Sequence, residues 1–146
     1  AHGFDFSPGM VDEARRRFPR MRFDVANIRN LPPPDAAGGW AAVTAWYAMV
    51  HMAPSELPGA IRAMGDRLRP GGWLAFALHL GPEVRHLAAW WDRPVDVDFV
   101  LHREGNVLHA VTTAGLELAE SYIRSPIADA EVATQRLYVL ARRPVG

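Results

Sequence analysis

The sequence predicts an α/β fold built on a mostly parallel β-sheet. Apolar runs typical of buried strands alternate with helical patterns along residues 1–114. The last two apolar runs, 116–124 and 135–143, have only a loop between them and therefore predict a closing antiparallel pair. With 146 residues the chain is long enough for one core, so we expect a single domain over 1–146.

The flanking residues define the N-terminal elements. A short apolar run ends at Asp5, and Ser7-Pro8 then begins a helix over Val11–Phe18, because proline suits a first helical turn. Apolar and polar residues alternate in Met21–Val25, which predicts a strand. Three prolines and two glycines predict a loop over Asn30–Gly39.

Two buried strands and a helix follow. The apolar run Trp40–Ala45, placed directly after two glycines, predicts a buried strand. Ser55 is expected to cap a helix that runs to about Leu68, because Leu57, Ile61, Met64 and Leu68 repeat at helical spacing. Pro70 and the glycines after it end this helix, and Trp73–Leu80 forms the next apolar strand.

The segment Gly81–Phe99 fits no single period. It contains two tryptophans, two prolines and mixed charge, and we predict a helix plus an irregular stretch. Because it follows a strand end, we expect 81–99 to form a lid on the substrate side. Glu104–Ala114 is predicted as a helix capped by Gly115, and 125–134 as a loop.

Composition excludes several classes of protein. The net charge is zero and no apolar run is long enough to span a bilayer, so we expect neither a nucleic-acid nor a membrane partner. Cysteine is absent, and the His, Asp and Glu residues lack metal-ligand spacing, so no metal site is expected. All 16 basic residues are arginine, which favours a GC-rich bacterial genome. Because no membrane-spanning run and no signal peptide are visible, a cytoplasmic protein is the default expectation.

Several segments, in the correct order, resemble the class I S-adenosylmethionine-dependent methyltransferases, specifically small bacterial methyltransferase-domain proteins. The segment GFDFSPGMVDEARRRFP resembles the second-strand motif of that family, FDVANIRNLPPPD the third, AVTAWYAMVHM the fourth and LRPGGWLAFALH the fifth. EVRHLAAWWDRPVDVDF followed by TQRLYVLARRP resembles an actinobacterial-type subgroup. The resemblance covers nearly the whole chain and implies a Rossmann-like sheet with an antiparallel final strand, and S-adenosylmethionine as cofactor.

The resemblance assigns roles to residues at the strand ends. Asp5 would bind the ribose hydroxyls, and Phe6 and Met10 would flank the adenine. Asn27 stands where the family usually has an aspartate that accepts from the adenine amino group; its amide oxygen can still accept but carries no charge. Ile28 would offer its backbone N–H to the adenine ring.

Three further positions complete the implied cofactor site. Ala26 replaces a common glycine, while Ala45 and Trp46 would place backbone groups near the methionine portion of the cofactor. The family's first strand and its GxGxG loop normally precede the ribose carboxylate by roughly 20 residues. Only four residues precede Asp5, so we expect that an N-terminal strand-helix unit, roughly 40–60 residues, lies outside this sequence. A degenerate or swapped domain is the alternative.

Methyl transfer from a sulfonium is an in-line displacement, which needs alignment and, for an O–H or N–H nucleophile, a base. His79 ends the fifth-motif strand and is the candidate base; a structural histidine bonded to a loop is an equal alternative. Tyr47, His86 and Trp90 are candidate substrate contacts. The alternatives are a solvent-facing His86 and core packing of Trp90 or its neighbour Trp91.

We therefore predict methyl transfer from S-adenosylmethionine to a small molecule. The first rival is a non-catalytic domain of the same fold that has lost cofactor binding, favoured by the absent glycine loop and by Asn27. The second is an NAD-type dinucleotide domain, because Asp5 alone fits both folds. The LRPGG motif and the closing strand pair argue against this second rival.

Overall fold

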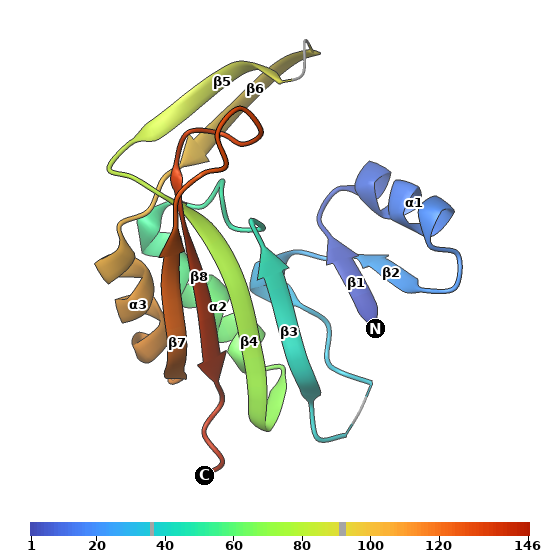
Figure 1. The fold of residues 1–146 in the computed structure, drawn as a ribbon. Helices are drawn as coiled ribbons and strands as arrows, with labels where there is room; N and C mark the ends of the chain where they lie inside the picture. The colour runs from blue at the N-terminus through green and yellow to red at the C-terminus, as the bar shows by residue number, and fades with distance from the viewer. Residues whose placement is uncertain (36, 91–92) are drawn as a thin grey trace.

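The computed structural model describes residues 1–35, 37–90 and 93–146. Their strands form three hydrogen-bonded groups: β1–β2, β3–β4–β8–β7 and β5–β6 (Figure 1). The strands are β1 (His2–Asp5), β2 (Arg22–Val25), β3 (Trp40–Trp46), β4 (Leu68–Leu80), β5 (Val84–Trp90), β6 (Arg93–Val100), β7 (Glu117–Arg124) and β8 (Gln135–Arg142). The helices are α1 (Pro8–Arg17), α2 (Leu57–Gly65) and α3 (Glu104–Thr113), with short 3₁₀ turns η1 (Ile28–Asn30) and η2 (Pro54–Glu56). The predicted α/β class is confirmed.

Strand β4 lies inside the largest sheet. It pairs in parallel with β3 and antiparallel with β8, whose other neighbour is β7. Alternate β4 residues Leu74, Phe76 and Leu78 are completely buried and join Leu57 and Ile61 of α2 in one apolar cluster. Helices α2 and α3 lie together on one side of this sheet (Figure 1). The core thus fixes β4 rigidly and sets where its carboxyl end lies.

The N-terminal unit consists of β1, α1 and β2. Ser7 caps α1 by accepting from the backbone N–H of Met10, and Pro8 occupies the first turn, as predicted. The Arg15 guanidinium donates to the Phe23 carbonyl at 2.6 and 3.0 Å, which fastens α1 to β2. Strands β1 and β2 run parallel in register, so Asp5 and Val25 end side by side.

The sheet is interrupted between β1 and β3. In the described chain, β1 is hydrogen-bonded to β2 and β3 to β4, and neither pairs with the other. The two parts still touch, because the Phe4 and Trp40 rings lie 5.6 Å apart. Among the described residues, β1 and β3 are therefore joined by side-chain packing and not by backbone pairing.

The helix predicted within Gly81–Phe99 is wrong: residues 84–90 and 93–100 form an antiparallel hairpin, β5–β6. Along β6, half-buried Val95 and Val97 alternate with exposed Asp96 and Asp98, a period of two that specifies a strand. The first half of the segment lacks this alternation, which explains the error. The hairpin projects beyond the carboxyl end of the main sheet (Figure 1).

The helix predicted to begin at Ser55 and end near Leu68 is shorter. Ser55 lies in η2 and makes no cap; instead the Glu56 carboxylate accepts from the Ala53 N–H at 2.8 Å. The helix ends at Gly65 because Leu68 already pairs with Trp40 at the start of β4. Backbone pairing between strands therefore overrides the apolar spacing that extended the helix in the prediction.

The remaining predicted elements are confirmed with shifts of a few residues. Gly115 adopts a positive φ of 80° after α3, as expected of a helix cap. Within the described ranges, no helix has both the length and the apolar character needed to cross a bilayer.

Gly39 provides a test of how β3 is joined to β4. Its φ is +98°, and an added Cβ would lie 2.7 Å from the Arg69 backbone nitrogen. Gly39→Ala should therefore lower the free energy of unfolding by about 1–3 kcal/mol in urea denaturation. The control is Gly38→Ala, where a Cβ meets nothing within 4 Å. Equal effects of the two variants would contradict this account of the turn.

Candidate functional site

Asp5 is held in a defined orientation at the end of β1. Its Oδ1 accepts from the Ser7 N–H at 2.8 Å, and its backbone carbonyl accepts from the Ala26 N–H at 2.9 Å. No described residue hydrogen-bonds the second carboxylate oxygen. A positioned carboxylate with an available oxygen can accept a hydrogen bond from a sugar hydroxyl.

Two apolar side chains stand exposed beside this carboxylate. Phe6 is 73% exposed and Met10 60%, although both belong to residue types that are usually buried. Their place, after β1 and in the first turn of α1, is where the sequence analysis expects the adenine. An aromatic ring and a thioether offer a flat, polarisable surface to such a base.

Asn27 has a structural role that the sequence did not reveal. Its Oδ1 accepts from the Arg29 N–H at 2.9 Å and thereby caps η1. The remaining lone pair of this oxygen and the amide N–H groups are left for a ligand. Ile28, the next residue, packs partly against the core. The predicted adenine contact of Asn27 therefore stays a prediction, in competition with its capping role.

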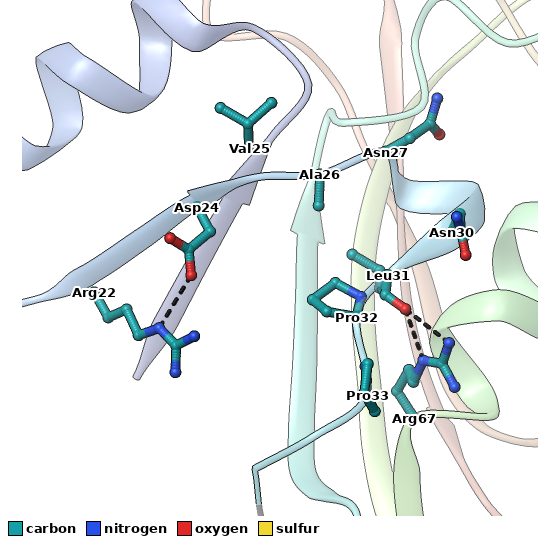
Figure 2. A pocket seen from close by; sticks show the side chains of 10 residues that line it. All are labelled: Arg22, Asp24, Val25, Ala26, Asn27, Asn30, Leu31, Pro32, Pro33 and Arg67. Carbon is teal, nitrogen blue, oxygen red and sulfur yellow. Dashed lines mark hydrogen bonds and ion pairs between the residues drawn. The ribbon is translucent and has the colours of Figure 1, made fainter.

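A cleft of about 600 Å³ lies beside the segment that follows β2 (Figure 2). It is lined by Arg22, Asp24, Val25, Ala26, Asn27, Asn30, Leu31, Pro32, Pro33 and Arg67. Both arginines are engaged, Arg22 with Asp24 and Arg67 with the Leu31 carbonyl. Of the eight predicted cofactor residues only Ala26 and Asn27 line it, so this cleft does not bring the predicted set together.

The end of β3 brings three predicted residues together. Ala45 is buried, whereas the Trp46 side chain is half-exposed. Tyr47 adopts a positive φ of 55°, uncommon for a residue with a side chain, while its N–H donates to the Ala77 carbonyl at 3.0 Å. This turn directs the Tyr47 ring toward His79, and the ring centroids are 4.8 Å apart.

His79 is nearly buried at the end of β4. Its Nδ1 hydrogen-bonds the Thr134 hydroxyl at 2.7 Å. Burial, and next the positive charge of Arg136, lower the pKa of His79, so the imidazole is neutral at neutral pH. A neutral imidazole can accept a proton, as the prediction of a base requires. The bond to Thr134 equally fits the structural alternative, and the catalytic role stays a prediction.

The sequence analysis missed a cluster of side chains around Tyr47. The Tyr47 and Tyr138 hydroxyls are 2.8 Å apart, and Arg124 donates to Tyr138 at 3.3 Å. Arg124 also makes two 2.8 Å bonds to Glu131, which, with the Ile127 N–H, lower the pKa of Glu131 to about 2. A signal for this cluster existed: because β8 runs antiparallel to both β4 and β7, its start lies at the same edge of the sheet as the ends of β4 and β7.

The predicted lid residues lie on the β5–β6 hairpin. His86 is exposed, and its Nδ1 lies 3.0 Å from Asp98 Oδ1 across the hairpin. Trp90 ends β5 on the same strand, while Trp91 lies outside the described residues. His51 Nδ1, 2.7 Å from the Asp98 carbonyl oxygen, ties the hairpin to the segment after β3. The helical lid is thus replaced by a hairpin, and its contacts with a substrate stay a prediction.

Comparison with known proteins finds similarity to methyltransferases. Residues 1–72 match the family model described as Methyltransferase domain. Trans-aconitate 2-methyltransferase of Methylobacterium nodulans is 45% identical over 76 residues, 50% of this chain and 26% of that protein. Malonyl-(acyl-carrier protein) O-methyltransferase of Serratia marcescens is 29% identical over 89 residues, 61% of this chain and 33% of that protein. The matches thus span a quarter to a third of the relatives' length.

Among solved structures, the crystal structure of a SAM-dependent methyltransferase from Methanosarcina mazei gives a TM-score of 0.84 at 11% identity. The superposition covers 99% of this chain and 82% of the Methanosarcina mazei chain. The fold is therefore that of the class I S-adenosylmethionine-dependent methyltransferases. Residues 1–72, just under half of this chain, are similar to the methyltransferase-domain family, and S-adenosylmethionine is the cofactor of this class.

The lowered pKa of His79 makes stability depend on pH. Below about pH 6.5 the imidazole of His79 is protonated in the unfolded chain but still neutral in the folded chain. The free energy of unfolding therefore decreases as the pH is lowered, until the folded imidazole is also protonated. His79→Gln should reduce the slope of unfolding free energy against pH in the range just below about pH 6.5. An unchanged slope in urea titrations of the variant would contradict the assignment.

Proposed function

We propose that this chain is part of an enzyme that transfers a methyl group from S-adenosylmethionine to a small molecule by in-line displacement. The observation that carries the proposal is Asp5, a carboxylate oriented by the Ser7 N–H at a strand end, with one oxygen available and two exposed apolar side chains beside it. When bound, the cofactor would supply an electrophilic methyl group, and the protein would supply alignment.

Each half of the chain has its own part in this proposal. The N-terminal unit, through Asp5, Phe6 and Met10, would hold the nucleoside. The ends of β3 and β4 would present the acceptor, with Tyr47 beside it and His79 as the base for an acceptor that carries an ionisable proton. Ala45 and Trp46, the last residues of β3, would adjoin the methionine portion of the cofactor.

The acceptor is proposed to be a small molecule rather than a nucleic acid. The names of the curated relatives specify trans-aconitate and malonyl-(acyl-carrier protein), and the net charge of this chain is zero. Nucleic-acid-binding domains are instead strongly basic. The bacterial sources of both relatives support a bacterial protein, and the proposal places it in the cytoplasm.

The rival function is a non-catalytic domain with this fold. The engagement of the Asn27 oxygen in capping η1 favours it, because an expected adenine contact is weakened. The two functions differ in whether the protein binds S-adenosylmethionine at all.

Asp5→Asn tests the proposal in the full-length protein. The amide oxygen can still accept from Ser7, but the charge and one acceptor are lost, so affinity for S-adenosylmethionine should fall by about tenfold or more in isothermal titration calorimetry. Asp12→Asn is the matched control, since Asp12 is a highly exposed acid on α1. Absence of binding by the unmodified protein would support the non-catalytic rival, and unchanged binding by Asp5→Asn would remove Asp5 from the site.

A further inference from the structure

Tyr47 and Tyr138 have one more hydroxyl hydrogen than their mutual bond uses. The 2.8 Å contact between their oxygens consumes one of the two O–H hydrogens, whichever residue donates. Among the described residues, no other acceptor bonds either hydroxyl. A half-buried phenol pair with an unused donor is a built hydrogen-bond site for an acceptor oxygen that is not part of this protein fold.

Arg124 determines which phenol gives up its proton more readily. A guanidinium can only donate, so its 3.3 Å bond makes the Tyr138 oxygen an acceptor. Hydrogen bonds with Tyr47 and, next, with Arg124 lower the pKa of Tyr138. Burial and, next, the hydrogen bond with Tyr138 raise the pKa of Tyr47 to about 12. Tyr138 is thus the more acidic phenol, and its O–H is the stronger donor of the two.

The charges around the pair favour an anion. The carboxylate of Glu131 neutralises Arg124. The buried Arg136 lies 3.6 Å from the same carboxylate, and its other hydrogen bonds go to uncharged backbone carbonyls. The cluster therefore keeps one net positive charge. His79 on β4 is neutral at pH 7, and on β5 Arg85 is paired with Glu83. Tyr122 on β7 stacks against the Tyr138 ring at 4.8 Å and adds no charge.

We propose that the Tyr47–Tyr138 pair binds the acceptor, and that the acceptor is a carboxylate: one of its oxygens takes the spare phenolic hydrogen while the other is methylated. This inference rests on the proposed function. The transfer balances without a base, because a carboxylate oxygen lone pair forms the new O–C bond while the methyl–sulfur bond breaks with its electrons going to sulfur. The product is a methyl ester, Arg124 acts as a positioning residue, and no proton moves.

The three tyrosines of the chain make a spectroscopic test tractable. Ultraviolet difference titration of the full-length protein should show one tyrosine that ionises below the ordinary range, absent in Tyr138→Phe and retained in Tyr122→Phe. Arg124→Gln should return this step toward the ordinary range. Added trans-aconitate should raise the pH of the step, since a bound carboxylate favours the neutral phenol, whereas trimethyl trans-aconitate should not.

Methyl transfer supplies the second readout. When carboxylic acids and their matched alcohols are each offered with S-adenosylmethionine, only the acids should be methylated, and the products should be methyl esters. The KM for the acid should rise about tenfold or more in Tyr138→Phe and Tyr47→Phe and stay unchanged in Tyr122→Phe. The inference is overturned if trans-aconitate does not shift the tyrosine step, or if only the alcohols are methylated. A shift of the step without any methyl transfer would keep this site and refute the proposed function.

Discussion

The pairing of β4 on both sides is the constraint on which the candidate site depends. Parallel bonds to β3 bring the end of β3 beside the end of β4, and antiparallel bonds to β8 place the start of β8 there as well. Tyr47, His79 and Tyr138, which are far apart in the sequence, therefore meet at one edge of the sheet. The complete burial of Leu74, Phe76 and Leu78 keeps that edge in register.

The N-terminal unit obeys a different constraint. Its β1–β2 pair is joined to the main sheet through side-chain packing such as the Phe4–Trp40 contact, without backbone pairing to β3. Asp5 owes its orientation to local bonds with Ser7 and Ala26, and these do not depend on the main sheet. The region around Asp5 and the ends of β3 and β4 are thus held by separate sets of backbone hydrogen bonds.

Sequence patterns predicted the elements whose signals are local. Ser7-Pro8, the apolar run of β4 and the glycine after α3 each act within a few residues, and the structure has the expected elements there. The β5–β6 hairpin was missed because its alternation is confined to one strand, and the other strand takes its conformation from pairing. The end of α2 was misplaced because pairing of Leu68 with Trp40 is a long-range contact.

The site divides in the same way. Strand-end positions such as Asp5 and His79 could be predicted because parallel strands share one carboxyl edge, a rule that needs only the order of elements. Their roles stay predictions. Tyr138 lies near the start of β8, which runs antiparallel to β4 and β7, so the rule for carboxyl ends does not identify it and the register decides which residue reaches the edge. Arg124, the last residue of β7, lies at the same edge. The most direct test is a crystal structure of the full-length protein with S-adenosylhomocysteine. The account predicts that the ribose hydroxyls bind Asp5 and that the sulfur lies beside Trp46 and Tyr47. A ligand bound elsewhere, with Asp5 making no contact to it, would contradict it.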